Sequence, residues 1–303
     1  MNLLGFGLPV SGSWATPEIQ RRVARRADEL GYSSLWTFQR LLHPPDEDAL
    51  AKVYRSVLDP VLPLAHVAAV TSRVRLGLGV LNLPFFSPAL LCKQVTTLDL
   101  LSQGRAELGV GLGWNRDEFT ASGADYAERG ARAEEFLDAL EALWAPGISE
   151  FHGRFYEVPP SRMDPQPVQE PHPPVLMGGF AAPSLRRAGR LTDGWMSSGR
   201  ADLTSLGDDV RTVRAAAAEA GRDPDALRFV CRAPVQVRES GDDGTPLRGP
   251  HEKIREDLQR LHEMGMTEVF LDLNFDPEIG HPEADPVRSL QRAEEVLEAF
   301  APA

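Results

Sequence analysis

Residues 74–114 read VRLGLGVLNLPFFSPALLCKQVTTLDLLSQGRAELGVGLGW. This stretch predicts a strand, a helix that begins at Pro88, and a second strand that ends in LGVGLGW. In the second strand Gly109, Gly111 and Gly113 remove the side chains from one face. Because glycine weakens a strand, it usually marks a close approach of a ligand or another backbone. We therefore expect a flat ligand at the C-terminal end of this strand.

Strand–helix alternation continues on both sides of this stretch. A capping residue followed by proline predicts helix starts at Thr16-Pro17, Asp59-Pro60, Ser87-Pro88 and Asp285-Pro286. Proline suits the first helical position because its missing N–H would have no helical partner there. Eight short runs rich in β-formers lie between the helices: Leu3–Leu8, Ser33–Phe38, Val74–Leu81, Ala106–Gly111, Pro174–Met177, Gly194–Ser197, Leu227–Val237 and Glu268–Leu273.

This strict alternation predicts an α/β fold with parallel strands joined by crossover helices. For 303 residues it favours a (β/α)8 TIM barrel that occupies residues 1–303 as a single domain. An open doubly wound sheet is the alternative. Longer segments predict insertions after strands 2, 4 and 7, at Gln39–Leu58, Glu150–Pro173 and Glu239–Gly249. We expect the first two, with residues 119–130, to cover a pocket, and a hairpin around Phe151–Tyr156.

The composition of the chain limits the kinds of molecule that it is expected to bind. The formal net charge is -12, which argues against nucleic acid, because phosphate binding needs a basic face. No apolar run approaches the roughly 20 residues that span a bilayer, and the N-terminus lacks the charged region of a signal peptide. Cys92 and Cys231 are far apart and predicted to be buried free thiols. The scattered histidines predict no metal site. We expect a cytoplasmic protein with a small-molecule substrate.

The sites of a barrel lie at the C-terminal ends of its strands. Met177–Phe180 follows an apolar strand and precedes a helix, where exposed amides and the helix dipole favour a phosphate, although a plain turn also uses glycine. Ser197 and Ser198 follow the next strand and could add donors. Asn82 follows the third strand and either faces the pocket or sits in a simple turn. Arg40 follows the second strand and either binds a carbonyl or anion or is a surface residue.

Four segments in order resemble the luciferase-like monooxygenase superfamily, and within it the coenzyme-F420-dependent branch. They are LGYSSLWTFQRLLHP from residue 30, the block of residues 71–123 that contains the opening stretch, RGARAEEFLDALEALW from residue 129, and PVLMGGFAAPSLRRAGRLTDGW from residue 174. The resemblance covers nearly the whole chain. It implies a barrel with a deazaflavin or flavin in its mouth, and relatives of this kind are often homodimers.

The resemblance also implies positions for the cofactor. A bulge, often with a non-proline cis peptide, is expected near Leu81-Asn82, the phosphate near Gly178, Gly179 and Phe180, and the ring beside the loop that starts at Gly113. Together with the residue patterns, it gives these cofactor-binding candidates: Gln39, Leu81, Asn82, Gly113, Trp114, Asn115, Met177, Gly178, Gly179, Phe180, Ser197 and Ser198. Arg186, Arg187 and Arg200 are candidates for the anionic tail.

The chain departs from its relatives at two positions. Many have an Asp-His pair where this sequence has Gln39-Arg40, and a sugar-phosphate dehydrogenase branch has glutamate at the position of Trp114. Sugar-phosphate activity is therefore not expected. Because arginine stays protonated, Arg40 is predicted to be catalytic as an electrostatic clamp on the ring carbonyl or substrate.

Three hypotheses follow from the sequence. The first is an oxidoreductase that transfers hydride between coenzyme F420 and a small organic substrate, the cofactor carrying the chemistry while the protein orients it. The second keeps the fold with FMN, as a two-component flavin monooxygenase. The third is a non-catalytic cofactor-binding homologue, suggested by the missing Asp-His pair.

Overall fold

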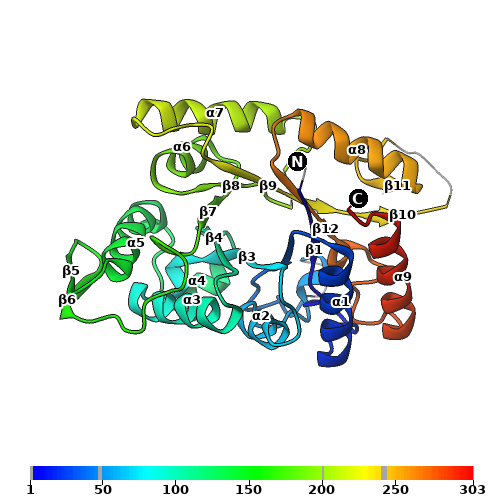
Figure 1. The fold of residues 1–303 in the computed structure, drawn as a ribbon, viewed down its shortest axis with the longest axis horizontal. Coiled ribbons are helices and arrows are strands. Elements are labelled where there is room, and N and C mark those ends of the chain that lie inside the picture. Colours follow the sequence, from blue (N-terminus) through cyan, green and yellow to red (C-terminus); the bar gives the residue numbers. More distant parts are fainter. Residues whose placement is uncertain (1–2, 47–49, 200, 240–243, 303) are drawn as a thin grey trace.

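The computed structural model describes residues 3–46, 50–199, 201–239 and 244–302. Eight parallel strands close into a barrel, so the predicted TIM barrel is confirmed over the open sheet (Figure 1). Neighbouring strands follow the chain order, and the last pairs with the first. The strands are β1 (Leu3–Gly7), β2 (Ser34–Thr37), β3 (Arg75–Asn82), β4 (Ala106–Gly111), β7 (Val175–Gly178), β8 (Gly194–Met196), β9 (Arg228–Pro234) and β12 (Glu268–Asp272).

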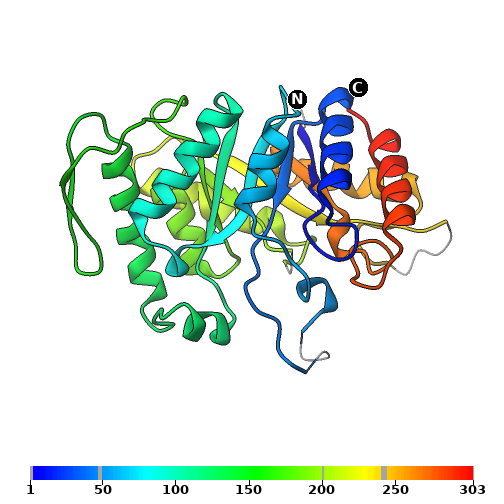
Figure 2. The same ribbon diagram turned by 90° about the horizontal axis from the view of Figure 1, so that it is seen from below.

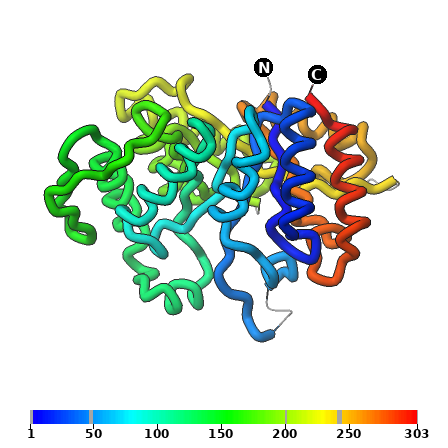
Figure 3. Tube along the Cα trace, turned by 60° about the horizontal axis from the view of Figure 1, so that its bottom comes forward, coloured from blue at the N-terminus to red at the C-terminus, as the bar shows by residue number. Residues whose placement is uncertain are grey.

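Helices surround the barrel, as Figures 1 and 2 show, and a short one, α4, lies in the connection after β4. The helices are α1 (Pro17–Leu30), α2 (Val61–Ala68), α3 (Pro88–Ser102), α4 (Arg116–Ala121), α5 (Arg129–Trp144), α6 (Ala182–Leu191), α7 (Leu206–Glu219), α8 (His251–Glu263) and α9 (Pro286–Ala299). The first and last helices pack side by side, which brings the two ends of the chain together (Figure 3).

Local capping explains where several helices begin. The side chains of Thr16, Ser87 and Asp285 accept hydrogen bonds from the first-turn amides, and proline follows each of them. At the fourth predicted start, α2 begins one residue later than expected, at Val61. Asp59 still caps this helix as predicted, since its carboxylate accepts the N–H groups of Val61 and Leu62 at 2.9 and 3.1 Å.

The barrel interior has two distinct layers below its mouth. At the N-terminal ends of the strands Arg75, Glu107, Arg228 and Glu268 form a buried ion network, in which each arginine contacts both carboxylates at 2.5 to 2.9 Å. Above it lies an apolar layer of Trp36, Leu176, Met196, Val230 and Phe270. A larger apolar core fills the space between strands and helices. The C-terminal ends of the strands are thus supported by a close-packed interior.

A bulge in β3 explains part of the glycine pattern in β4. The pairing shifts from Leu78 with Leu108 to Leu81 with Val110, so one extra residue of β3 is accommodated around Gly79 and Val80. A Cβ on Gly109 would stand 2.2 Å from the Leu78 carbonyl oxygen. The close approach at Gly109 is therefore that of another backbone.

The bulge lies earlier than its predicted position near Leu81-Asn82. The non-proline cis peptide joins Gly79 to Val80. Leu81 and Asn82 have already resumed regular pairing with Val110 and Gly111 of β4. This shift places Val80, rather than Leu81, at the disturbed point of the strand.

The predicted hairpin is present as β5 (Ser149–His152) and β6 (Glu157–Ser161), which pair antiparallel. It packs along α5, because the Glu135 carboxylate of that helix accepts the N–H groups of Arg154, Phe155 and Tyr156 at 2.6 to 3.0 Å. The Tyr156 ring also packs edge-on against Phe136 of α5. The expectation that Glu150–Pro173 covers the pocket is therefore wrong, since these contacts hold its hairpin against a helix and none of its residues line the cavity described below.

The other two insertions hold short elements. In its described residues the one after β2 contains the 3-10 turn η1 (Lys52–Tyr54). The one after β9 ends in the two-residue strand β11 (Arg248–Gly249), which pairs with β10 (Gln236–Val237) just before it. Both cysteines are free and buried, as predicted. In the described ranges no helix is long and apolar enough to cross a membrane, and no group of histidine, cysteine and carboxylate side chains could hold a metal ion.

Candidate active site

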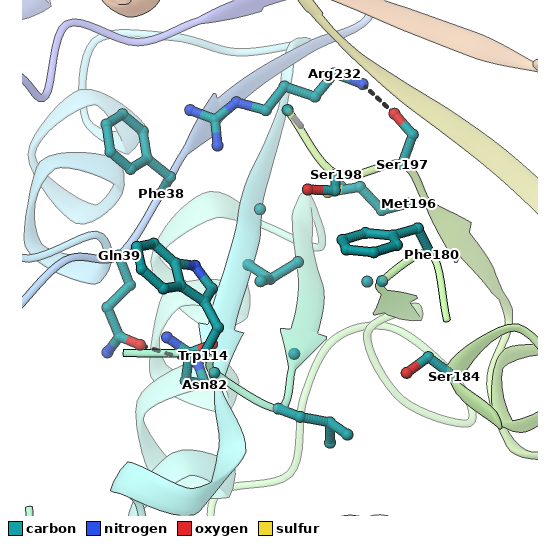
Figure 4. A pocket seen from close by; sticks show the side chains of 18 of the residues that line it. Phe38, Gln39, Asn82, Trp114, Phe180, Ser184, Met196, Ser197, Ser198 and Arg232 are labelled. Atoms are coloured by element: carbon teal, nitrogen blue, oxygen red, sulfur yellow. Dashed lines mark hydrogen bonds between the residues drawn. The ribbon is translucent and has the colours of Figure 1, made fainter. Parts of the chain in front are cut away.

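A cavity of about 320 Å³ opens at the C-terminal ends of the barrel strands (Figure 4). Its walls come from the ends of β2, β3, β4, β7, β8 and β9 and from the connections that follow them. Most of the residues predicted from the sequence meet there, although they come from distant parts of the chain. Those that line the cavity are Gln39, Arg40, Asn82, Gly113, Trp114, Gly178, Gly179, Phe180, Ser197 and Ser198.

Three candidates lie near the cavity without lining it. Leu81 and Met177 are fully buried in the apolar core between strands and helices, because alternate residues of a strand point to opposite sides. Asn115 caps α4, where its Oδ1 accepts the Asp117 N–H at 3.0 Å. Cofactor binding by these three residues stays a prediction. Because their side chains point elsewhere, only their backbone atoms could make the contact.

Val80 lines the cavity between two glycines. A Cβ on Gly111 would stand 2.7 Å from Val80 Cγ2, and a Cβ on Gly178 would stand 2.8 Å from Val80 Cγ1. All three residues line the cavity. The glycines of β4 and β7 thus make room for the bulged residue of β3, which leaves a smooth, apolar surface of the kind that a flat ring can lie on.

One end of the cavity lies at the start of α6. Gly178, Gly179 and Ser184 line it there, and no side chain caps the first turn of the helix. Gly179 has φ 131°, which side chains rarely adopt, and a Cβ there would stand 3.0 Å from the Ser184 Cβ. Amides at an uncapped helix start are suited to an anion. Trp195 fixes the turn by donating its Nε1–H to the Gly179 oxygen at 2.7 Å.

Gln39 and Asn82 form the opposite side of the cavity in Figure 4. Both are buried, and the Gln39 Oε1 accepts the backbone N–H of Asn82 at 2.9 Å. The contact ties the end of β2 to the end of β3 just beyond the bulge. Gln39 therefore has at least a structural task at the position where many relatives were expected to carry aspartate.

Arg40 is buried beside the cavity, with its side chain only 4% exposed. Its Nη2 donates to Glu118 Oε2 at 2.7 Å, and the guanidinium carbon stands 4.6 Å from the centroid of the Trp114 ring. The Nε and Nη1 atoms are buried and have no hydrogen-bond partner. Burial lowers the pKa of Arg40, and the nearby Glu118 opposes that shift. Arginine remains a cation at neutral pH, so Arg40 acts through charge rather than through proton transfer.

Arg232 is a lining residue that the sequence analysis missed. It reaches from β9 toward Phe38, and its guanidinium carbon is 4.4 Å from that ring (Figure 4). Asp272 accepts its Nε–H at 2.7 Å, and Ser197 Oγ accepts its backbone N–H at 3.1 Å. An arginine inside the apolar strand FVCRAPV was the available signal, because charged residues are rarely buried without a partner.

Other lining residues come from the connections. Tyr54, Tyr126 and Arg129 lie in the segments 39–58 and 119–130, which were expected to cover the pocket, whereas Phe38 just after β2 was not predicted. Of the arginines expected at an anionic tail, Arg186 and Arg187 do not line the cavity, and Arg200 lies outside the described residues. Arg129, the first residue of α5, does line the cavity, and its guanidinium carbon lies 3.8 Å from the centroid of the Tyr126 ring.

The lining has few groups that could transfer a proton. Among the described residues it contains no aspartate, glutamate, histidine, lysine or cysteine side chain. Its hydroxyls belong to Tyr54, Tyr126, Ser184, Ser197 and Ser198. These described lining residues therefore offer no carboxylate or imidazole as a general base.

Comparison with known proteins places the chain in a family. The family model described as luciferase-like monooxygenase matches residues 6–244. The chain belongs to this family. Among the relatives of this luciferase-like protein, an uncharacterized protein of Mycobacterium bovis is 30% identical over 289 residues, which are 92% of each chain. The FMNH2-dependent dimethylsulfone monooxygenase of Pseudomonas putida is 34% identical over 153 residues, which are 49% of this chain and 42% of the relative.

Solved structures share the fold of this luciferase-like barrel. A monooxygenase from Streptomyces bottropensis has a TM-score of 0.82 at 24% identity and covers 99% of this chain and 98% of its own. An F420-dependent secondary alcohol dehydrogenase, solved with an F420–acetone adduct, has a TM-score of 0.78 at 17% identity and covers 99% of both chains. At these identities the likeness establishes the barrel, and family membership indicates an oxidoreductase.

Proposed function

We propose that this protein is an oxidoreductase that transfers a hydride between coenzyme F420 and a small organic substrate. The observation that carries the proposal is the Val80 surface between Gly111 and Gly178, which leads directly to the uncapped start of α6. A flat ring on that surface and a phosphate at the helix start would occupy one continuous cavity.

The residues present fit such a cofactor. Side chains at Gly111 or Gly178 would collide with Val80, so glycine keeps the wall flat for a ring. At the far end, Gly179 and Ser184 are placed to donate to a phosphate, and Arg129 adds a positive charge to the cavity lining. The buried Nε and Nη1 of Arg40 lack an acceptor, which a ring carbonyl or a substrate oxygen would supply.

When bound, a deazaflavin supplies hydride chemistry and reacts poorly with oxygen. The chain's contribution is placement and charge. Arg40 stabilises negative charge that develops at the cavity mouth, since it stays protonated. Trp114 and Tyr54 restrict access of water to the buried guanidinium by packing over it, at 4.6 and 5.3 Å. With no carboxylate or imidazole in the lining, a proton lost by the substrate would pass to a hydroxyl or to solvent.

A flavin monooxygenase that uses FMN is the second candidate. It is favoured by the similarity to the Pseudomonas putida enzyme, whose name states that it uses FMNH2. The same Val80 surface and helix start would serve an FMN ring and phosphate. In that case reduced FMN comes from a separate reductase, and the reaction consumes oxygen.

Fluorescence titrations with coenzyme F420 and with FMN distinguish the two cofactors. We expect the deazaflavin to bind in the micromolar range or tighter and FMN to bind much more weakly. Preference for FMN, together with oxygen consumption on adding reduced FMN, would establish the monooxygenase. Tight binding without turnover across a substrate panel would instead identify a non-catalytic homologue.

Gly179→Asp tests the phosphate position. A carboxylate at this point repels the phosphate and its Cβ crowds Ser184, so affinity for the deazaflavin should fall by at least about tenfold. The control is Gly221→Asp, which introduces the same charge at a positive φ but with no atom within 4 Å of the added Cβ. Unchanged cofactor affinity in Gly179→Asp would refute the assignment of this end.

A homodimer is also part of the proposal. Leu62 of α2 and Leu90 and Leu101 of α3 are 53–70% exposed, and a partner's helices would cover such apolar side chains. Light scattering measures the mass directly. A mass of 33.2 kDa at micromolar concentration would contradict the dimer.

A further inference from the structure

The charged side chains on the cavity wall are all of one sign. Within the described residues they are Arg40, Arg129 and Arg232, although the whole chain has a net charge of -12. The carboxylates that neutralise Arg40 and Arg232 belong to Glu118 and Asp272, which lie behind them and do not line the cavity. The cavity therefore presents positive charge at its surface and is suited to anions.

These arginines occupy two separate parts of the wall. Arg129 lies at the start of α5, where its guanidinium stacks on the Tyr126 ring at 3.8 Å. Arg40 and Arg232 are linked instead through three aromatic rings that follow β2 and β4. The guanidinium of Arg40 lies over Trp114 and Tyr54, and that of Arg232 lies over Phe38. Tyr54 joins the two groups, with ring centroids 6.2 Å from Phe38 and 6.4 Å from Trp114.

Both arginines of this second part have unused donors. Arg40 Nε and Nη1 and Arg232 Nη2 are buried and have no hydrogen-bond acceptor, although Arg232 Nη2 stands 2.6 Å from an Asp272 oxygen in poor hydrogen-bond geometry. An unsatisfied buried donor on a charged group is costly, and such groups are usually explained by a missing partner. A cofactor phosphate held at α6 would leave these donors without one.

We propose that the substrate is an organic anion whose carboxylate or sulfonate group is held by Arg40, with Arg232 adding positive charge on the same cavity wall. Its flat apolar body lies against the rings of Trp114, Tyr54 and Phe38. Guanidinium groups suit planar oxyanions because their N–H groups diverge in a fixed plane, and charge-assisted hydrogen bonds are stronger than neutral ones. This inference rests on the proposed function, since it names the substrate class of the same site.

Paired probes test the charge requirement. Benzoate and benzamide have nearly the same shape, and only benzoate is an anion. Calorimetric titration of the protein saturated with its cofactor should give at least about tenfold tighter binding of benzoate. Benzenesulfonate and benzenesulfonamide form the corresponding pair for a sulfonate, so the two pairs together show which oxyanion the site prefers. Equal affinity for both members of each pair, or binding of neither anion, would overturn the inference.

Removing Arg40 alone would leave Glu118 as an unpaired buried charge and risk unfolding. The double variant Arg40→Met, Glu118→Gln removes both charges together. Its preference for benzoate over benzamide should fall to within about twofold. The variant should still bind the cofactor, because the residues proposed to hold the phosphate, Gly178, Gly179 and Ser184, are unchanged. The matched control Arg129→Met should weaken the cofactor and keep the preference for benzoate.

The outcomes separate the inference from the proposed function. If neither F420 nor FMN binds, the proposed function fails, and the benzoate preference of the cofactor-free protein still reports on Arg40 and Arg232. If a cofactor binds and the anion preference persists in the double variant, the function stands and the inference is wrong.

Discussion

At the N-terminal end of the barrel Arg75 and Arg228 each contact two carboxylates, whereas at the C-terminal end Arg40 contacts one and has two buried nitrogens without an acceptor. Both regions bury arginine among strand ends, so burial alone does not distinguish them. The base is neutral and internally satisfied, and its task is stability. At the mouth, buried N–H donors of Arg40 lack an acceptor. This lowers the stability of the free protein, and a bound ligand that accepts from them would offset the loss.

The largest expected effect is at the base. Glu268→Gln leaves Arg75 and Arg228 with one carboxylate between them, so the free energy of unfolding should fall by about 3–5 kcal/mol. Urea denaturation measures this loss. The control Glu150→Gln, at a half-exposed carboxylate paired only with His152, should change stability by less than about 1 kcal/mol. Equal losses in the two variants would remove the distinction between a buried network and a surface pair.

Gly109→Ala tests the bulge that shapes the mouth. The new Cβ would stand 2.2 Å from the Leu78 carbonyl oxygen, so the strands must separate at a cost of about 1–3 kcal/mol. We expect lower cofactor affinity as well, because Val80 would move. Gly207→Ala is the control, since its Cβ would come within 3.5 Å only of the flexible end of Arg211 and alanine favours the helix. Wild-type stability and affinity in Gly109→Ala would refute the role of the bulge.

Glu118→Gln sharpens the comparison at the mouth. It leaves the Arg40 cation without its counter-charge, so stability should fall by about 1–3 kcal/mol. Added benzoate should restore part of the loss, because an anion in the cavity can replace the missing charge. The same addition should not rescue Glu268→Gln, whose network lies beneath the apolar layer. Thermal denaturation with and without benzoate measures both, and rescue of neither variant would contradict an anion site.

The smallest effect is expected in acid. Burial raises the pKa of Glu268, but Arg75 and Arg228 outweigh it and hold the pKa below its ordinary value of 4.5. Such a carboxylate contributes stability that is fully present above the ordinary pKa and is lost as the pH falls through the lowered folded pKa. Below about pH 4.5 the unfolding free energy of the wild type should therefore decline more steeply than that of Glu268→Gln. If the unfolding free energies of the wild type and Glu268→Gln declined equally between about pH 3 and 6, the expected loss of the Glu268 contribution in acid would be contradicted.

Several features of the molecule could be predicted from the sequence because they depend on neighbours in the chain. Apolar runs between capped helices predicted all the barrel strands, and the turn Gly178-Gly179 before α6, predicted as an anion site, lines the cavity. The positions of the cavity residues followed from one rule, that the C-terminal ends of barrel strands share one face.

The tertiary structure alone decided which side chains complete the cavity and which do not. Glu118 meets Arg40 across 78 residues, and Asp272 meets Arg232 across 40, so neither pair has a local signal. The hairpin looked like a cover because it is aromatic, yet the Glu135 carboxylate holds it on α5. The sequence by itself determined the strands, the helix starts and the family. Closure of the barrel determined the bulge at Val80 and the unmatched arginines, because contacts between distant segments exist only once the strands are in register.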